Sequence, residues 1–124
     1  MEKTRLIPCG AKEFTLKIGS YERGRLAGTL LHPRLAGEAP FESFIGLAVM
    51  MEDLMDLEDC PGAEAPTAVG SGGIDRPIAT FRIEVLFRQN HSWQGRLIWQ
   101  EQRQEANFRS ALELILLLDE ILAA

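Results

Sequence analysis

The sequence predicts an α+β fold in which two ββ(β)α units share one antiparallel sheet of four to six strands, with two helices packed on one face of the sheet. Three observations predict it: the two halves of the chain resemble each other, each half carries two stretches of alternating apolar residues, and each half ends in a leucine-rich or methionine-rich stretch of helical length. Because 124 residues suit one compact core, we expect residues 1–124 to form a single domain.

The two halves align without a gap when residues 14–57 are laid over residues 81–124. We therefore predict an internal duplication, with a first repeat at 13–57, a Gly/Pro/Ala-rich linker at 58–77 and a second repeat at 79–124. The alternative is two units that share a pattern only because they share a fold. The identical pairs are Phe14/Phe81, Gly28/Gly95, Leu30/Leu97, Glu38/Glu105, Ala39/Ala106, Phe41/Phe108, Ser43/Ser110 and Leu47/Leu114.

Each half begins with two strands, because apolar residues alternate with polar ones over a length typical of a half-buried strand. A short polar turn separates the two runs, which favours a hairpin. A further extended piece around Phe41 or Phe108 would add a third strand. In the second hairpin, Trp93, Gly95, Leu97 and Trp99 alternate on one face, so we expect both tryptophans to fill the core beneath the helices. The recurring glycines suggest close approach by Phe41 or Phe108.

The helices are expected at 44–57 and 111–123, each with a serine at the N-cap position, and Glu113 can complete a capping box with Ser110. A projection of 100° per residue places apolar side chains in the polar sector of both helices. Either the helices bury these side chains against each other, or a partner covers them. We expect a homodimer interface made by Ile45, Val49, Leu112 and Leu116.

The open face of the sheet is the second candidate interaction surface, with an excess of arginine and lysine among scattered apolar residues. Three interpretations stay open for it: a solvated face, a protein contact and a binding surface for single-stranded nucleic acid. The net charge of −5 makes nucleic acid the less favoured partner, with Tyr21 as the aromatic available for base stacking. The residues proposed for this face are Arg82, Arg88, Arg96, Leu86 and Ile98, joined by Lys17 and Arg25 for nucleic acid.

Neither a catalytic set nor a cofactor or metal site is predicted. His32 and His91 have no local nucleophile, and the acidic end of the first helix, EDLMDLED, lacks the spacing and glycine of a calcium loop. We interpret that end as a solvated acidic surface. The alternatives are contact with the arginine-bearing hairpins of the same chain, a basic partner or a divalent cation, because carboxylates at a helix C-terminus oppose the helix dipole.

These observations favour a small cytoplasmic, non-enzymatic interaction or regulatory module that forms a homodimer. The N-terminal residues contain no apolar run of signal-peptide length, and we expect no membrane association. Two alternatives stay open: nucleic-acid binding through the open sheet face, and small-ligand binding at the seam between the repeats.

Overall fold

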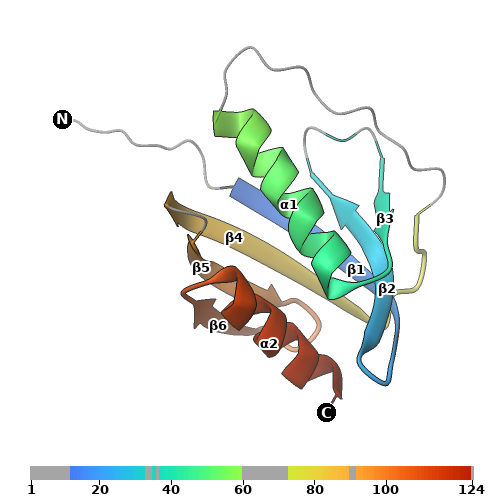
Figure 1. Cartoon of the computed structure of the whole chain (residues 1–124). Coiled ribbons are helices and arrows are strands. Elements are labelled where there is room, and N and C mark those ends of the chain that lie inside the picture. Colours follow the sequence, from blue (N-terminus) through green and yellow to red (C-terminus); the bar gives the residue numbers. More distant parts are fainter. Residues whose placement is uncertain (1–11, 33–34, 36, 60–72, 90–91, 124) are drawn as a thin grey trace.

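The computed structural model describes residues 12–32, 35, 37–59, 73–89 and 92–123. Within these ranges the chain forms an α+β fold with one six-stranded antiparallel sheet and two helices on the same side of it (Figure 1), as predicted. The elements are β1 (Lys12–Glu22), β2 (Arg25–Leu31), β3 (Ala39–Phe41), α1 (Phe44–Asp59), β4 (Ala79–Gln89), β5 (Ser92–Trp99), β6 (Gln104–Phe108) and α2 (Ala111–Ala123).

The strands lie in the order β3-β2-β1-β4-β5-β6, so each half of the chain contributes one three-stranded block. The blocks meet where β1 pairs with β4, and Thr15 is the partner of Arg82 in the middle of that pairing. Both halves follow the order strand, strand, strand, helix. The expected extra strands around Phe41 and Phe108 are confirmed as β3 and β6 at the two edges of the sheet.

The first hairpin closes with a tighter turn than the sequence suggested. Only Arg23 and Gly24 separate β1 from β2, and both have positive φ angles, of 53° and 78°. Two successive residues of this kind are typical of a type I′ turn, whose twist matches that of the flanking strands. The arginine tolerates this backbone less well than glycine does, so the turn depends on the hairpin around it.

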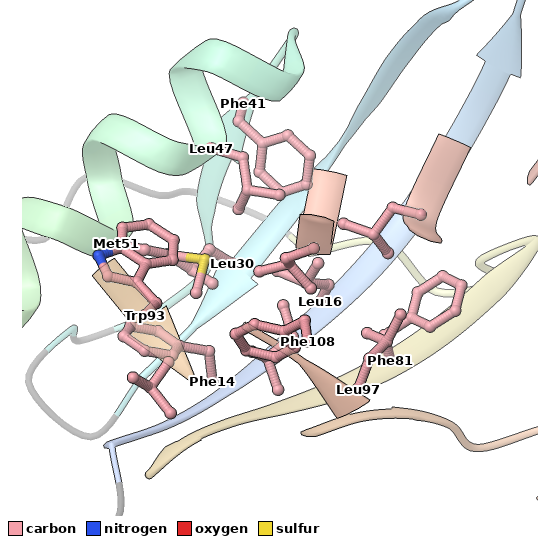
Figure 2. Packing of buried hydrophobic residues seen from close by; sticks show 14 of the residues in the cluster. Phe14, Leu16, Leu30, Phe41, Leu47, Met51, Phe81, Trp93, Leu97 and Phe108 are labelled. Carbon is pink, nitrogen blue, oxygen red and sulfur yellow. The ribbon is translucent and has the colours of Figure 1, made fainter. Parts of the chain in front are cut away.

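The core lies between the sheet and the helices and receives side chains from both halves (Figure 2). Trp93 is buried to 2% exposure, while Trp99 is partly buried and packs near Phe81 with ring centroids 6.1 Å apart. The predicted core role is therefore confirmed for Trp93, and Trp99 packs against the edge of the same core. Helix α1 contacts β2 and β3, whereas α2 contacts β1, β5 and β6.

Serine side chains begin both helices, as predicted. The Ser43 hydroxyl accepts a hydrogen bond from the Gly46 amide at 2.9 Å, and the Ser110 hydroxyl accepts one from the Glu113 amide at 3.0 Å. The Glu113 carboxylate accepts from the amide of Arg109 at 2.9 Å, one residue earlier than a capping box requires. Each cap satisfies an amide that has no partner within its helix.

A β-bulge interrupts both long strands at matching places and corrects one expectation. The register shifts between Ile18 and Ser20 in β1 and between Val85 and Phe87 in β4. Because the side chains of a strand alternate, one extra residue moves every later side chain to the opposite face. Tyr21 was expected on the open face, but the bulge brings it to the helix side, where it packs against the core.

The same shift applies to Arg88, whose backbone is paired with Trp93 on the helix side of the register. The side chain of Arg88 lies outside the described part of the chain, so its expected place on the open face stays a prediction.

The two recurring glycines lie opposite these bulges. A Cβ at Gly95 would overlap the carbonyl oxygen of Glu84, and a Cβ at Gly28 would overlap the carbonyl oxygen of Lys17. The prediction named Phe41 and Phe108 as the close neighbours. Phe41 does approach Gly28, with its ring 3.1 Å from the Cβ position, but the tightest neighbour in both cases is the backbone of the adjacent strand.

Candidate functional site

The outward face of the two helices carries four large aliphatic side chains that no other part of the described chain covers. Ile45 is 75% exposed, Val49 53%, Leu112 64% and Leu116 58%. The two helices therefore do not bury these residues against each other, and the first of the two expected alternatives is wrong. We call this surface, on the side of α1 and α2 away from the sheet, the helix face.

Acidic side chains continue the same ridge of each helix after the aliphatic ones. In α1, Asp53 follows Val49 by four residues, and in α2, Glu120 follows Leu116 by four, so each carboxylate lies one turn further along the ridge. Both carboxylate residues are exposed. Neither helix contains a lysine, arginine or histidine, so the helix face has apolar and negative groups and lacks positive groups of its own helices.

Two further helix carboxylates already have partners within the chain. Asp119 accepts a hydrogen bond from the Tyr21 hydroxyl, which links the end of β1 to α2. This hydrogen bond, together with burial and the negative charge of Asp119, raises the pKa of Tyr21 above its ordinary value. Glu113 caps the amide of Arg109. Asp53 and Glu120 are thus the exposed acidic positions of this ridge.

The two helices run in opposite directions across the sheet (Figure 1). The aliphatic beginning of each helix is therefore on the side of the molecule where the other helix ends. This arrangement distributes the apolar and acidic groups over both halves of the helix face.

On the opposite side of the sheet, the basic side chains expected to attract a partner are paired with carboxylates. Arg82 and Arg96 contact the two carboxylate oxygens of Glu84 at 2.8 Å and 2.6 Å, and Arg82 also contacts Glu13 at 3.3 Å. Glu84 is only 5% exposed. Burial raises its pKa, but the hydrogen bonds and positive charges of Arg96 and Arg82 outweigh that effect, so its pKa is lowered overall.

A second carboxylate occupies the first half of this face. Glu38 contacts the Lys17 ammonium at 2.8 Å and accepts hydrogen bonds from the Thr29 hydroxyl at 2.6 Å and the Ile74 amide at 3.2 Å. The hydrogen bonds from Lys17 and Thr29 lower the pKa of Glu38. Residues 73–77, the described end of the expected linker, thereby lie across this part of the sheet, and Ile74 lies over Gly19. Residues 60–72 of that linker lie outside the described residues.

The sequence did not predict that Glu38 and Glu84 pair with the basic residues of this face, and these ion pairs change the interpretation of the open face. Glu84 follows Arg82 by two residues and so shares its face, a signal present in the sequence. Its second partner, Arg96, comes from the neighbouring strand, and that contact depends on the strand register. With Lys17, Arg82 and Arg96 paired and Tyr21 on the other face, this surface offers little of what a nucleic acid recognises.

The apolar residues proposed for the open face are only partly available there. Leu86 lies at the bulge of β4 and is 49% exposed, while Ile98 is partly buried. Ile98 also lines a shallow hollow of about 380 Å³ with Arg82 and Arg103.

The seam between the two halves is closed by the backbone pairing of β1 with β4, and one continuous core lies under both helices. A hollow of about 200 Å³ lies elsewhere, between α2 and the strands β5 and β6, where Trp99, Leu117 and Glu120 line it. The buried indole nitrogens of Trp93 and Trp99 have no hydrogen-bond partner among the residues that the structure describes.

The described residues hold no group of three or more histidine, cysteine, aspartate or glutamate side chains that could bind a metal ion. His32 packs against Phe14 with ring centroids 5.0 Å apart, and His91 lies outside the described residues. Among the helices in the described ranges, neither is long and apolar enough to cross a membrane.

Comparison with protein-family models, with curated proteins and with solved structures found no match for this chain. The surfaces themselves are therefore the basis for the function proposed below.

Proposed function

We propose that the chain is a non-enzymatic protein-interaction module that docks its partner on the helix face. The observation that carries the proposal is the exposure of Ile45, Val49, Leu112 and Leu116 in matching turns of the two helices. Single exposed apolar residues are common on protein surfaces and need no explanation. Four large aliphatic side chains, two on each helix and all directed away from the sheet, form a surface of the kind that mediates interactions.

Burial of these side chains against a partner would lower the free energy, because apolar surface would be removed from water. Removal of apolar surface from water contributes roughly 25 cal/mol for each Å². In solvent these positions contribute nothing to the core, because the buried residues of the helices, such as Leu47, Met51, Leu114 and Leu118, lie on the opposite side. A polar residue would serve folding equally well at each of the four exposed positions, so an interaction is the role that accounts for them.

A second copy of the chain is the partner that the sequence predicts, and the homodimer stays a prediction. Sedimentation analysis of the intact chain over a range of concentrations tests it. If two copies meet through the helix face, Leu116→Glu should shift the protein to the monomer mass, because a charge would be buried in the interface. Gln102→Glu, which adds the same charge in the exposed turn before β6, is the matched control. A single monomer mass for the unmodified chain would overturn the homodimer.

We also propose that the two halves arose by internal duplication. The elements repeat in the same order, and the bulges at Ile18/Ser20 and Val85/Phe87 are separated by the offset that aligns the two sequences. The aromatic contacts Phe14–His32 and Phe81–Trp99 are related by the same offset. A chain that carries the second repeat in both positions should fold cooperatively with an unchanged circular dichroism spectrum; an unfolded product would argue for two unrelated units.

A further inference from the structure

We infer that the partner of the helix face is a basic amphipathic helix, with apolar residues along one side and lysine or arginine beside them. This inference rests on the proposed docking function and specifies the chemistry of the partner. It follows from the charges beside the exposed aliphatic residues, from their spacing, and from the pairing of the basic residues on the other side of the sheet.

The two helices contain many acidic residues and no basic ones. Together they contain Glu52, Asp53, Asp56, Glu58 and Asp59 in α1 and Glu113, Asp119 and Glu120 in α2, with no basic residue in either. Among these residues, Asp53 and Glu120 are exposed and lie one turn beyond the aliphatic side chains of the helix face. Positive side chains of a partner beside them would make the electrostatic potentials of the two surfaces complementary.

The aliphatic and acidic groups of the helix face are regularly spaced along each helix. On each helix the aliphatic residues lie four apart, and the exposed carboxylate lies four further on. One helical turn, about 5.4 Å, therefore separates neighbouring groups of the ridge. An amphipathic helix presents anchors at the same repeat of three or four residues, so its apolar side can contact the aliphatic turns while its basic side chains reach the carboxylates.

A second copy of this chain matches these requirements less well. A face-to-face contact would bring together two surfaces that both contain exposed carboxylates and no basic residue of their helices, and like charges brought close to each other are destabilising. The basic residues on the open side of the sheet offer no replacement in the described structure, because Lys17 is paired with Glu38, and Arg82 and Arg96 are paired with Glu84. These three residues are therefore engaged on their own side of the sheet, and the proposed partner supplies the positive groups.

The test uses the full chain and labelled synthetic helices of about 18 residues, or about five turns. The first peptide has leucine along one side and lysine along the other. The second replaces every lysine by glutamate, and the third has the composition of the first in an order that is not amphipathic. Binding is measured by fluorescence anisotropy at low and at high salt. We expect the leucine/lysine helix to bind more tightly than both other peptides, with an affinity that falls as salt rises.

Two pairs of variants examine the apolar and the acidic groups separately. Val49→Ser with Leu116→Ser should weaken binding by at least about tenfold, because aliphatic anchors in an interface commonly contribute that much. Asp53→Asn with Glu120→Gln should weaken it by roughly three- to tenfold at low salt and by less at high salt. Glu22→Gln with Asp75→Asn removes two exposed charges away from the helix face and should leave binding unchanged. Circular dichroism confirms that each variant is folded.

The outcomes separate this inference from the docking function on which it rests. Equal binding of the lysine and glutamate helices, or no effect of the Asp53/Glu120 pair, would overturn the basic partner. If Leu116→Glu then dissociates a homodimer in sedimentation, the docking function still holds and the partner is a second copy. If the Val49/Leu116 pair changes neither peptide binding nor mass, both the inference and the docking function are wrong.

Discussion

Thr15 and Arg82 face each other in the pairing of β1 with β4, and they are equivalent positions of the two halves. The partners on either side obey the same relation: Lys12 pairs with Val85, and Ile18 pairs with Ala79. The two three-stranded blocks are therefore arranged symmetrically about this pair. The sheet becomes continuous there, and the helices of both halves share one core, so stability depends on residues from both halves.

Trp93 is expected to be a major contributor to that core. Replacing it with alanine should lower the free energy of unfolding by about 3–5 kcal/mol, because a large buried side chain is lost and a cavity remains. Urea denaturation followed by circular dichroism measures the change. Leu112→Ala, at an exposed position of the helix face, is the comparison and should change stability by no more than about 0.5 kcal/mol. Similar values for the two variants would contradict the core assignment.

The backbone approach at Gly95 predicts a strong local requirement for glycine. Gly95→Ala should destabilise the protein by about 1–3 kcal/mol, because the added methyl group overlaps the backbone of Glu84 and forces the bulged strand to move. Thermal unfolding reports the effect. Gly24→Asn serves as a control, because no atom lies near that position and asparagine tolerates a positive φ. An unchanged melting temperature for Gly95→Ala would mean that the strands can separate there at little cost.

Because the pKa of Glu84 is lowered in the folded chain, we expect the free energy of unfolding to depend on pH. The ionised form of Glu84 favours folding above the pKa of the unfolded chain, and this contribution is lost as pH falls through the folded-state pKa. At neutral pH, Glu84→Gln should cost about 1–3 kcal/mol of unfolding free energy, since Arg82 and Arg96 lose their charged acceptor.

The difference between the wild-type chain and Glu84→Gln should shrink in acid, where the wild-type carboxylate is protonated. Urea titrations at several pH values measure it. A difference that stays constant from neutral to strongly acidic pH would show that the ion pairs do not contribute to stability.

Tyr21 is the only tyrosine in the chain, so an absorbance titration reports on it directly. Its pKa should lie above the ordinary tyrosine value, because the hydrogen bond to Asp119 favours the protonated hydroxyl. Asp119→Ala removes the acceptor and the negative charge and should bring the pKa down. Asp53→Ala, which removes a carboxylate from the other helix, should leave the titration unchanged. Identical titration curves for the wild-type chain and Asp119→Ala would place the tyrosine hydroxyl elsewhere.

Local patterns in the sequence were sufficient to predict the main elements of the fold. Alternation of apolar residues indicated the strands, Ser43 and Ser110 indicated where the helices begin, and the order of the segments indicated an antiparallel α+β sheet. The side of the sheet on which Trp93 lies was also predictable, because its strand alternates without interruption. These features depend on neighbours within a few residues, so the sequence alone contains the information.

The tertiary structure decided the features that depend on how distant segments pair. The bulge in β1 turned Tyr21 to the helix side. Alternation of residues along the strand does not reveal this change, because the extra residue is recognised only from the pairing of β1 with β2. The pairing of Arg96 with Glu84 required the register of β4 against β5, and it neutralised the charges expected to attract a nucleic acid. The sequence indicated the four aliphatic residues of the helix face as an interaction surface. Whether they are exposed or buried between the helices was decided by the packing of both helices on the sheet. Register and packing are properties of the whole fold, because each is determined by contacts between residues far apart in the chain.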